Sequence, residues 1–268
     1  MDGLSHLLLA LSGLLAGFLG GLLGIGGSSV MLPAMVLILG ELDARGVRQI
    51  NQYQAAAMIC NFVLILPAVA AHARRRAIWR RLWAWMAPAA AVGVLIGVQI
   101  SYSIDRTYLQ WAVGAFFVYV VVHNIDRLIR GQRAEGRSRA AVEGGPRWPR
   151  LAIGLPMGVA AGLLGIGGGS LAVPAQQVVL KVPLRNAIAT SAAVIAAVSW
   201  IGAISKNAQL GVDGSVGRSL TLAACLAPTA MVGAYIGGHL THTLPLRAVR
   251  AAFIALMAAS AAKMFGWI

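Results

Sequence analysis

A glycine-rich stretch occurs twice in this chain, and this repetition constrains the fold more than any other feature. Residues 24–33 read GIGGSSVMLP, and residues 165–174 read GIGGGSLAVP, 141 positions further on. A second pair of blocks, residues 86–97 and 226–237, matches at an offset of 140. Duplicated glycine-rich interruptions inside apolar sequence are typical of membrane carriers built from two halves around a central site. The sequence therefore predicts two related membrane halves.

The composition is that of a membrane protein. Of the 268 residues, 59% are hydrophobic and 11% are charged, and the mean hydropathy is +0.77. The net charge of +14 comes from arginines in short loops, where they set topology and meet anionic lipid headgroups, so no nucleic-acid partner is expected. The eight acidic residues lie at span ends or in loops, which favours an anionic or neutral substrate over a cation.

Eight hydrophobic segments are predicted, and the first and fifth are longer than the rest because each contains a glycine-rich break. The other six are long enough for about one bilayer crossing each. The segments cover residues 7–39, 51–71, 82–101, 108–129, 151–180, 187–205, 219–240 and 247–267. They divide the chain into a first membrane repeat over residues 1–129, an arginine-rich cytoplasmic linker over 130–148 and a second membrane repeat over 149–268.

Loop charges suggest how the two halves are oriented. The arginine-rich loop at 74–81 and the linker should be cytoplasmic. If every segment crossed once, the basic loops of the second half, around 181–185 and 247–250, would lie outside. The conflict disappears if both broken segments enter and leave on the same side, since each half then crosses three times and the halves are inverted. Lys206, Asp213 and Arg218 are expected in the loop after the sixth segment.

The expected fold is therefore an all-α polytopic integral membrane protein with two inverted repeats. Each repeat holds a glycine-broken, re-entrant helix and three spanning helices. Eight plain crossings with parallel halves remain the alternative.

The two breaks have the chemistry of an anion site. Non-helical backbone at membrane depth must be buried in protein or beside water. Serine is a favoured N-cap, so the serines after each break are expected to begin a second half-helix, whose first N–H groups attract an anion. The candidate substrate-binding residues here are Gly26, Gly27, Ser28, Ser29, Gly167, Gly168, Gly169 and Ser170. The alternative is that glycines only allow tight helix packing, which we expect for Gly13, Gly17 and Gly21.

A second polar patch opens the second and sixth segments. The second segment opens with Asn51-Gln52-Tyr53-Gln54, of which Tyr53-Gln54 align with Thr190-Ser191 of the sixth segment at an offset of 137. Polar groups at these positions need another helix or a substrate oxygen as partner, and Gln54, Thr190 and Ser191 are candidate site residues. Arg48 and Arg185 stand just before those segments, where they would attract or gate an anion, or else snorkel to the interface. Among the other polar residues, Asn61 is expected to form a helix–helix hydrogen bond. The spans contain no metal-ligand cluster and no nucleophile–base pair, so neither a cofactor nor an enzyme is expected.

These residues resemble a known family. The two GLLGIGG blocks, the proline after each, PLRNAIATS at 183–191 and the two APxxxVGxxIG blocks are similar to the TauE/SafE family, the sulfite exporter or 4-toluene sulfonate uptake permease group. The resemblance covers nearly the whole chain except the linker, and it departs at Tyr53-Gln54, where Thr-Ser is commoner. It implies a multi-pass protein of the bacterial inner membrane that transports sulfite, organosulfonates or related anions, export being the commoner assignment. The same resemblance places substrate at the breaks and at Thr190-Ser191.

The function expected is alternating-access secondary transport, in which half-helix N-termini hold the oxygens of an anion. A small-anion channel with the same fold is one alternative, and a membrane assembly factor or enzyme is another. The expected partners are a small anionic substrate and the lipid bilayer, and a homo-oligomer is left open.

Overall fold

The computed structural model describes residues 3–23, 26–39, 46–105, 138–212 and 216–240, with isolated positions within 107–128 and 251–265. These residues form helices and contain no strand, so the all-α prediction is confirmed. The helices are α1 (Gly3–Leu23), α2 (Ser28–Leu39), α3 (Gly46–Arg74), α4 (Arg80–Ser103), α6 (Arg139–Glu143), α7 (Trp148–Leu164), α8 (Gly169–Val179), α9 (Leu184–Val212) and α10 (Val216–Leu240). The segments predicted at 108–129 and 247–267 lie largely outside the described residues.

Within the described residues, four helices are long and apolar enough to cross a bilayer: α3, α4, α9 and α10. Helices α1, α2 and α7 carry shorter apolar stretches. Large apolar side chains are exposed on the outer surface, among them Leu95, Trp200 and Tyr235. Lipid covers such a surface in a multi-pass membrane protein, as the composition predicts. The boundaries of the two repeats and of the linker stay a prediction.

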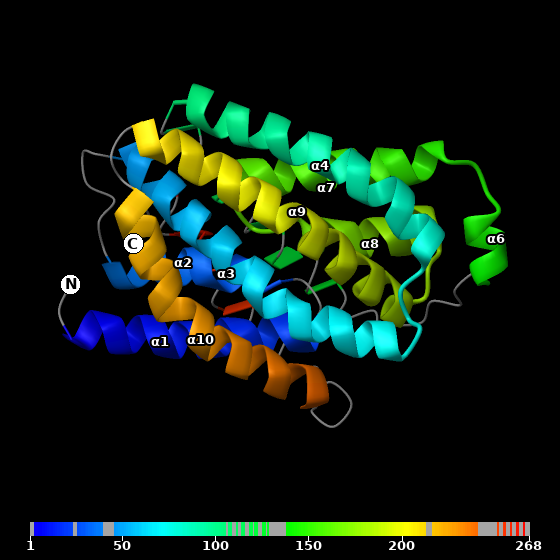
Figure 1. Ribbon diagram of the computed structural model, residues 1–268, viewed down its shortest axis with the longest axis horizontal. Helices are drawn as coiled ribbons and strands as arrows, with labels where there is room; N and C mark the ends of the chain where they lie inside the picture. The colour runs from blue at the N-terminus through cyan, green and yellow to red at the C-terminus, as the bar shows by residue number, and fades with distance from the viewer. Residues whose placement is uncertain are drawn as a thin grey trace.

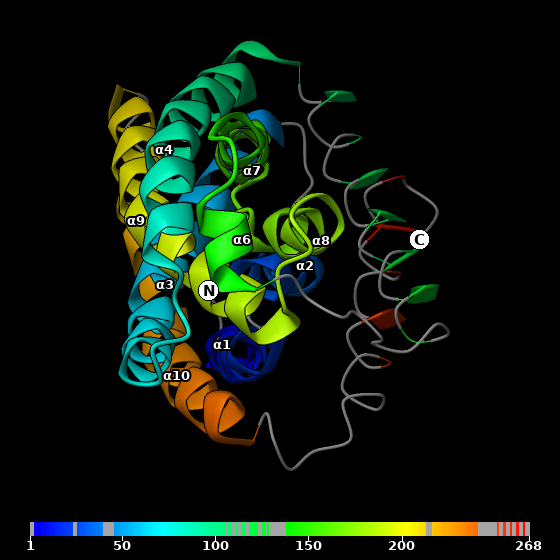
Figure 2. The ribbon, with the colours of Figure 1, turned by 90° about the vertical axis from the view of Figure 1, so that its right-hand side faces the viewer.

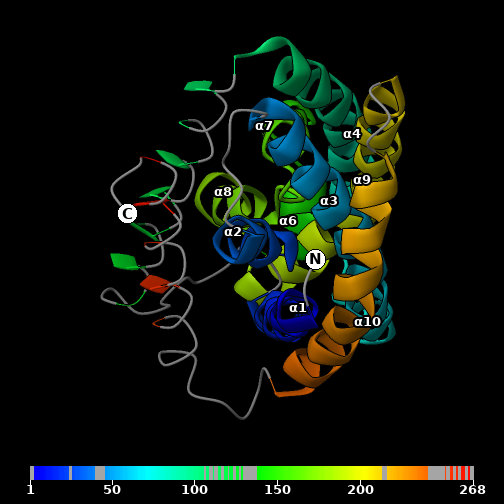
Figure 3. The ribbon, with the colours of Figure 1, turned by 90° about the vertical axis from the view of Figure 1, so that its left-hand side faces the viewer.

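The helices pack in two layers. Helices α4, α9, α3 and α10 stand side by side in one layer, and α7, α8, α2 and α1 lie against it (Figures 2 and 3). Helix α1 packs on α10 while α7 packs on α4, and α3 contacts α10 while α9 contacts α4. Helix α2 contacts α1 and α3, just as α8 contacts α7 and α9. The two halves of the chain therefore repeat the same set of helix pairs.

Both glycine-rich segments reverse the chain. A β-carbon placed on Gly27 would lie 3.1 Å from the carbonyl oxygen of Ala16, and one on Gly168 would lie 2.5 Å from that of Met157. A continuous helix would separate residues eleven positions apart by about 16 Å, so neither segment continues straight. Helix α2 accordingly lies toward the end of the molecule where α1 begins, and α8 lies toward the opposite end, which carries α6 (Figure 1).

Hydrogen bonds fix which ends of the long helices meet. The Asn186 side chain donates to the Ala77 carbonyl at 2.9 Å, and the Trp79 amide donates to Thr190 Oγ1 at 3.2 Å. The start of α9 therefore lies beside the connection that follows α3, and α9 runs antiparallel to α3. Glu143 of α6 accepts from the Arg81 amide at 3.2 Å, so this part of the linker lies at the same end.

The position of Lys206 corrects the sequence interpretation. The sixth segment was expected to end at residue 205 with Lys206 in the loop beyond it, but α9 continues to Val212 and Lys206 is completely buried. Its ammonium group is held by side chains of α3 and α4, which are far from it in the sequence. Arg218 was also expected in this loop and lies instead in the first turn of α10, whereas Asp213 is outside the described residues.

Small residues bring the paired helices into backbone contact. A β-carbon on Gly17 of α1 would overlap the Ala230 carbonyl of α10, and one on Gly158 of α7 would overlap the Ala90 carbonyl of α4. Gly13 makes a similar approach to Leu226. The packing role expected for Gly13 and Gly17 is thereby confirmed, and the second half uses matching glycines in the same way.

Replacing Gly158 by alanine is expected to lower the free energy of unfolding by about 1–3 kcal/mol, because α7 must move away from α4 to admit the methyl group. The matched control is Gly217→Ala in the first turn of α10, where a β-carbon meets no atom within 4 Å. There alanine should leave the stability unchanged or raise it by about 0.5–1 kcal/mol. Thermal unfolding of both purified variants measures the difference, and equal melting temperatures would contradict the close packing.

Candidate functional site

The two breaks are turns that require glycine. Gly26 has a φ of +83°, and Gly165, Gly167 and Gly168 have φ values of +70°, +69° and +71°. L-residues rarely adopt this conformation, whereas glycine does so at little cost. Every described residue from Gly26 to Ser29 and from Gly165 to Gly169 is buried, as the prediction of buried non-helical backbone requires. Residues 24 and 25 lie outside the described part of the chain.

Asn61 of α3 lies between the two breaks. A β-carbon on Gly26 would lie 2.6 Å from Asn61 Oδ1, and one on Gly167 would contact Asn61 Nδ2. The Asn61 amide donates to Ser199 Oγ of α9 at 3.0 Å, which confirms the helix–helix hydrogen bond predicted for this residue. The fold thus brings the glycines of two distant segments to one side chain in the middle of the molecule.

The prediction that serines occupy the N-cap positions of the half-helices is wrong. Helix α2 begins at Ser28, and the Gly27 carbonyl before it accepts from the amides of Val30 and Met31, both at 3.0 Å. In the second copy Gly168 occupies the cap position, and it has no side chain with which to cap α8. Gly168 is favoured there because its left-handed φ and the adjacent Met157 carbonyl leave no place for a side chain.

The displaced serines have different surroundings. The Ser29 hydroxyl donates back to the Gly26 carbonyl at 3.1 Å and so stabilises the turn. The Ser28 hydroxyl is buried and has no hydrogen-bond partner among the described residues. Ser170 lies in the first turn of α8, and its side chain is outside the description.

In the second polar patch, Gln54 and Ser191 lie beside the second broken segment, whereas Thr190 lies at the end of the molecule. Gln54, Thr190 and Ser191 are all fully buried. A β-carbon on Gly165 would lie 2.5 Å from Gln54 Cβ, so Gln54 contacts the second break. Ser191 Oγ accepts from Gln176 Nε2 of α8 at 2.6 Å and ties α9 to the broken helix. Thr190 instead accepts from the Trp79 amide at the α3–α4 connection.

The two arginines predicted to attract or gate an anion occupy the first turns of long helices. Arg48 belongs to α3 and Arg185 to α9. Their side chains lie outside the described residues, so their roles stay a prediction.

Lys206 is the functional candidate that the sequence interpretation missed. Its ammonium donates to Gln54 Oε1 at 2.6 Å, to Ser101 Oγ at 2.7 Å and to Asn51 Oδ1 at 3.3 Å. It also lies 5.4 Å from the centroid of the Tyr102 ring. No carboxylate in the described part of the chain forms an ion pair with it. A span of about 20 residues that begins at Asn186 already reaches Lys206, so helix length was the available signal.

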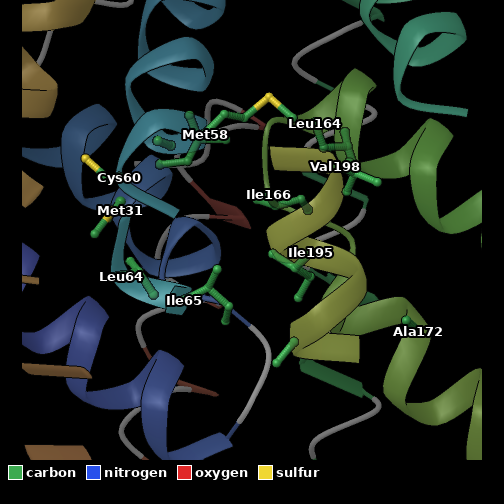
Figure 4. Packing of buried hydrophobic residues seen from close by; sticks show 14 of the residues in the cluster. Met31, Met58, Cys60, Leu64, Ile65, Leu164, Ile166, Ala172, Ile195 and Val198 are labelled. Atoms are coloured by element: carbon green, nitrogen blue, oxygen red, sulfur yellow. The ribbon is translucent and has the colours of Figure 1, made fainter. Parts of the chain in front are cut away.

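The two breaks are embedded in the buried apolar core. Figure 4 shows buried residues of α2 and α3, among them Met31, Met58 and Leu64, and buried residues of the second half, among them Leu164, Ile166, Ile195 and Val198. Within the described residues there is no group of three or more His, Cys, Asp or Glu side chains that could hold a metal ion. Serine hydroxyls, amide groups, helix N-termini and one lysine thus make up the polar chemistry of the site.

Comparison with known proteins agrees with this arrangement. The family described as "Sulfite exporter TauE/SafE" matches residues 9–264. Probable membrane transporter protein MamO of Magnetospirillum gryphiswaldense is 26% identical over 96% of this chain, and Probable membrane transporter protein YunE of Bacillus subtilis is 24% identical over 92% of both chains. This chain spans 44% of the length of that MamO and 19% of the length of the MamO of Paramagnetospirillum magneticum.

These relatives are named as membrane transporters and not as enzymes. The match of the family over nearly the whole chain agrees with the paired glycine breaks, the spanning helices and the apolar outer surface. The chain is a multi-pass membrane protein that belongs to the sulfite exporter TauE/SafE family of membrane transporters.

Proposed function

We propose that this protein is a secondary transporter of small sulfur-containing anions, such as sulfite or organosulfonates, in the bacterial inner membrane. The observation that carries the proposal is the meeting of two buried glycine breaks at Asn61, with a half-helix beginning directly after each. The first N–H groups of a helix have no intrahelical partner, and the helix dipole adds partial positive charge there. Two such N-termini that approach one point form a site for an anion.

The anion preference and the sulfur chemistry have separate support. Donor groups at the breaks favour an anion of any kind. The choice of sulfite and of export as the direction rests on the description of the family, and the choice of organosulfonates rests on the resemblance of the sequence motifs. The names of the relatives specify a transporter without a substrate.

We further propose that the halves are inverted repeats that rock around the site in alternating access. Three observations support this: each broken segment doubles back, α9 runs antiparallel to its counterpart α3, and both halves use the same helix pairs. The arginine-rich loop and the described part of the linker lie at one end, which the positive-inside rule makes cytoplasmic. Inverted repeats with broken helices at the midplane are a recurrent design of secondary transporters.

Cysteine labelling tests this topology. Single cysteines at Leu42 and Lys181 follow the first and the second broken segment, respectively; Lys181 is exposed, whereas its neighbour Val182 is fully buried. In oriented cells or vesicles, a membrane-impermeant thiol reagent should label Leu42→Cys only from outside and Lys181→Cys only from inside. Both native cysteines, Cys60 and Cys225, are first replaced by alanine. Labelling of both positions from outside would favour eight plain crossings with parallel halves.

The unpartnered Ser28 hydroxyl provides a test of the site. Ser28→Ala removes a buried hydroxyl that has no partner among the described residues, so the melting temperature should stay unchanged or rise. If that hydroxyl donates to the anion, sulfite or methanesulfonate uptake into proteoliposomes should fall about tenfold or more at limiting concentration. Saturable uptake that competing anions inhibit would also distinguish a carrier from a channel.

Ser103→Ala is the matched control for this experiment. Ser103 is exposed near the end of α4 and donates to the Gln99 carbonyl of its own helix, so uptake should be unchanged. Wild-type uptake rates in Ser28→Ala would remove this hydroxyl from the site. Failure of the wild-type protein to transport any sulfur anion would refute the proposed substrate class.

A further inference from the structure

Lys206 is a charged group in an unusual place. It lies inside the candidate span Asn186–Gly211 and is fully buried, and no carboxylate among the described residues pairs with it. Ionisable side chains within membrane spans are costly, and they commonly mark the pathway of a substrate or an ion. The three acceptors around its ammonium are the neutral oxygens of Asn51, Gln54 and Ser101. The side-chain nitrogen is therefore hydrogen-bonded by neutral oxygens, with no carboxylate among the described residues to balance its positive charge.

The ammonium group fixes the orientation of two side-chain amides. When Lys206 is protonated, its ammonium has three donors and no acceptor, so only the oxygens of Asn51 and Gln54 can face it. Their NH₂ groups must then point away from Lys206. Both Asn51 Nδ2 and Gln54 Nε2 are buried and have no hydrogen-bond partner within the described part of the chain. Lys206 thus leaves two amides with only their donor groups available.

The other amides at the breaks lack this constraint. Asn61 bonds to the Ser199 hydroxyl, and Gln176 bonds to the Ser191 hydroxyl. A hydroxyl both donates and accepts, so either orientation of these amides is compatible with its neighbour. Of these four amides, only those of Asn51 and Gln54 are obliged to present N–H donors. Such donors bind an anion and disfavour a cation.

Gln54 connects this arrangement to the second break. Its Cβ lies next to Gly165, which turns the chain between α7 and α8, while its Oε1 lies 2.6 Å from the ammonium. Asn51 is one helical turn earlier on α3, so both residues lie on the same side of that helix. The two donor groups therefore come from the face of α3 that meets Lys206 and the broken helix.

We propose that Lys206 is the fixed positive charge of the anion site and orients the Asn51 and Gln54 amides so that their N–H groups bind the transported anion. This inference rests on the proposed function and adds the group that neutralises the anion within the membrane. The charge belongs to one half only, because the position that corresponds to Lys206 at the offset relating Gln54 to Ser191 is Val69. The site therefore has a positive side, which the repeat alone does not provide.

Gln54→Glu separates this role from a purely structural one. A glutamate still accepts from Lys206 and forms an ion pair with it, so the melting temperature without anion should be maintained or rise. The same change removes the N–H donors and adds a negative charge, so anion binding should be lost. A structural role for Gln54 would move both quantities in the same direction, whereas the proposal requires that they move apart.

The experiment uses the full chain, purified in nanodiscs, and measures the rise in melting temperature with sulfite or methanesulfonate, together with proteoliposome uptake of the same anions. Gln54→Glu and Lys206→Met should weaken the apparent affinity about tenfold to a hundredfold or abolish it. Asn51→Asp serves as a second carboxylate variant should either of these fail to fold. The matched controls are Gln99→Glu and Lys181→Met, which alter exposed residues and should respond to anions as the wild type does.

The outcomes distinguish this inference from the proposed function. If the wild type binds the anions and the three variants bind them equally well, the role of Lys206 is refuted while anion transport stands. If the wild type responds to neither anion in either assay, the proposed function fails and this inference fails with it. Loss of binding in the variants with retained folding and unaffected controls supports both.

Discussion

The structure depends on the burial of two interrupted helices in the middle of a membrane protein. Backbone groups that leave the helical pattern at this depth have no water to bond, so they must be enclosed by other helices. Glycines with positive φ reverse the chain, and α3 and α9 close around the turns through Asn61 and Ser199. Once two such ends are enclosed together, their first N–H groups make the centre electropositive.

This enclosure requires helices that approach closely. Lipid is as apolar as leucine, so the association of membrane helices relies on packing and hydrogen bonds more than on exclusion of water. Glycine-lined contacts of α1 with α10 and of α7 with α4 supply that packing, while side-chain hydrogen bonds tie α9 to α3, α4 and α8. The same two kinds of contact thus hold both layers together.

Two kinds of polar group in the interior carry positive charge, the Lys206 ammonium and the half-helix N-termini. Neutral oxygens of Asn51, Gln54 and Ser101 solvate the Lys206 ammonium without cancelling its charge, and the half-helix N-termini add partial positive charge nearby. In surroundings of low dielectric constant, such groups interact more strongly with an anion than they would in water. Under the proposed function, such an interior would favour an anion that leaves water and would exclude a free cation.

The sequence by itself determined the helical class, the duplicated breaks, the packing glycines and the apolar spans, because these follow from local composition and from a repeat that is visible in the chain. Only the tertiary structure decided that Asn61 joins the two breaks, that glycines and not serines precede the half-helices, and that Lys206 is buried. Hydropathy averaged along a chain places a lysine near a span end in the loop, since it contains no information on distant partners. The acceptors that hold Lys206 lie on α3 and α4, about 100 to 155 residues away, and only folding brings them to it.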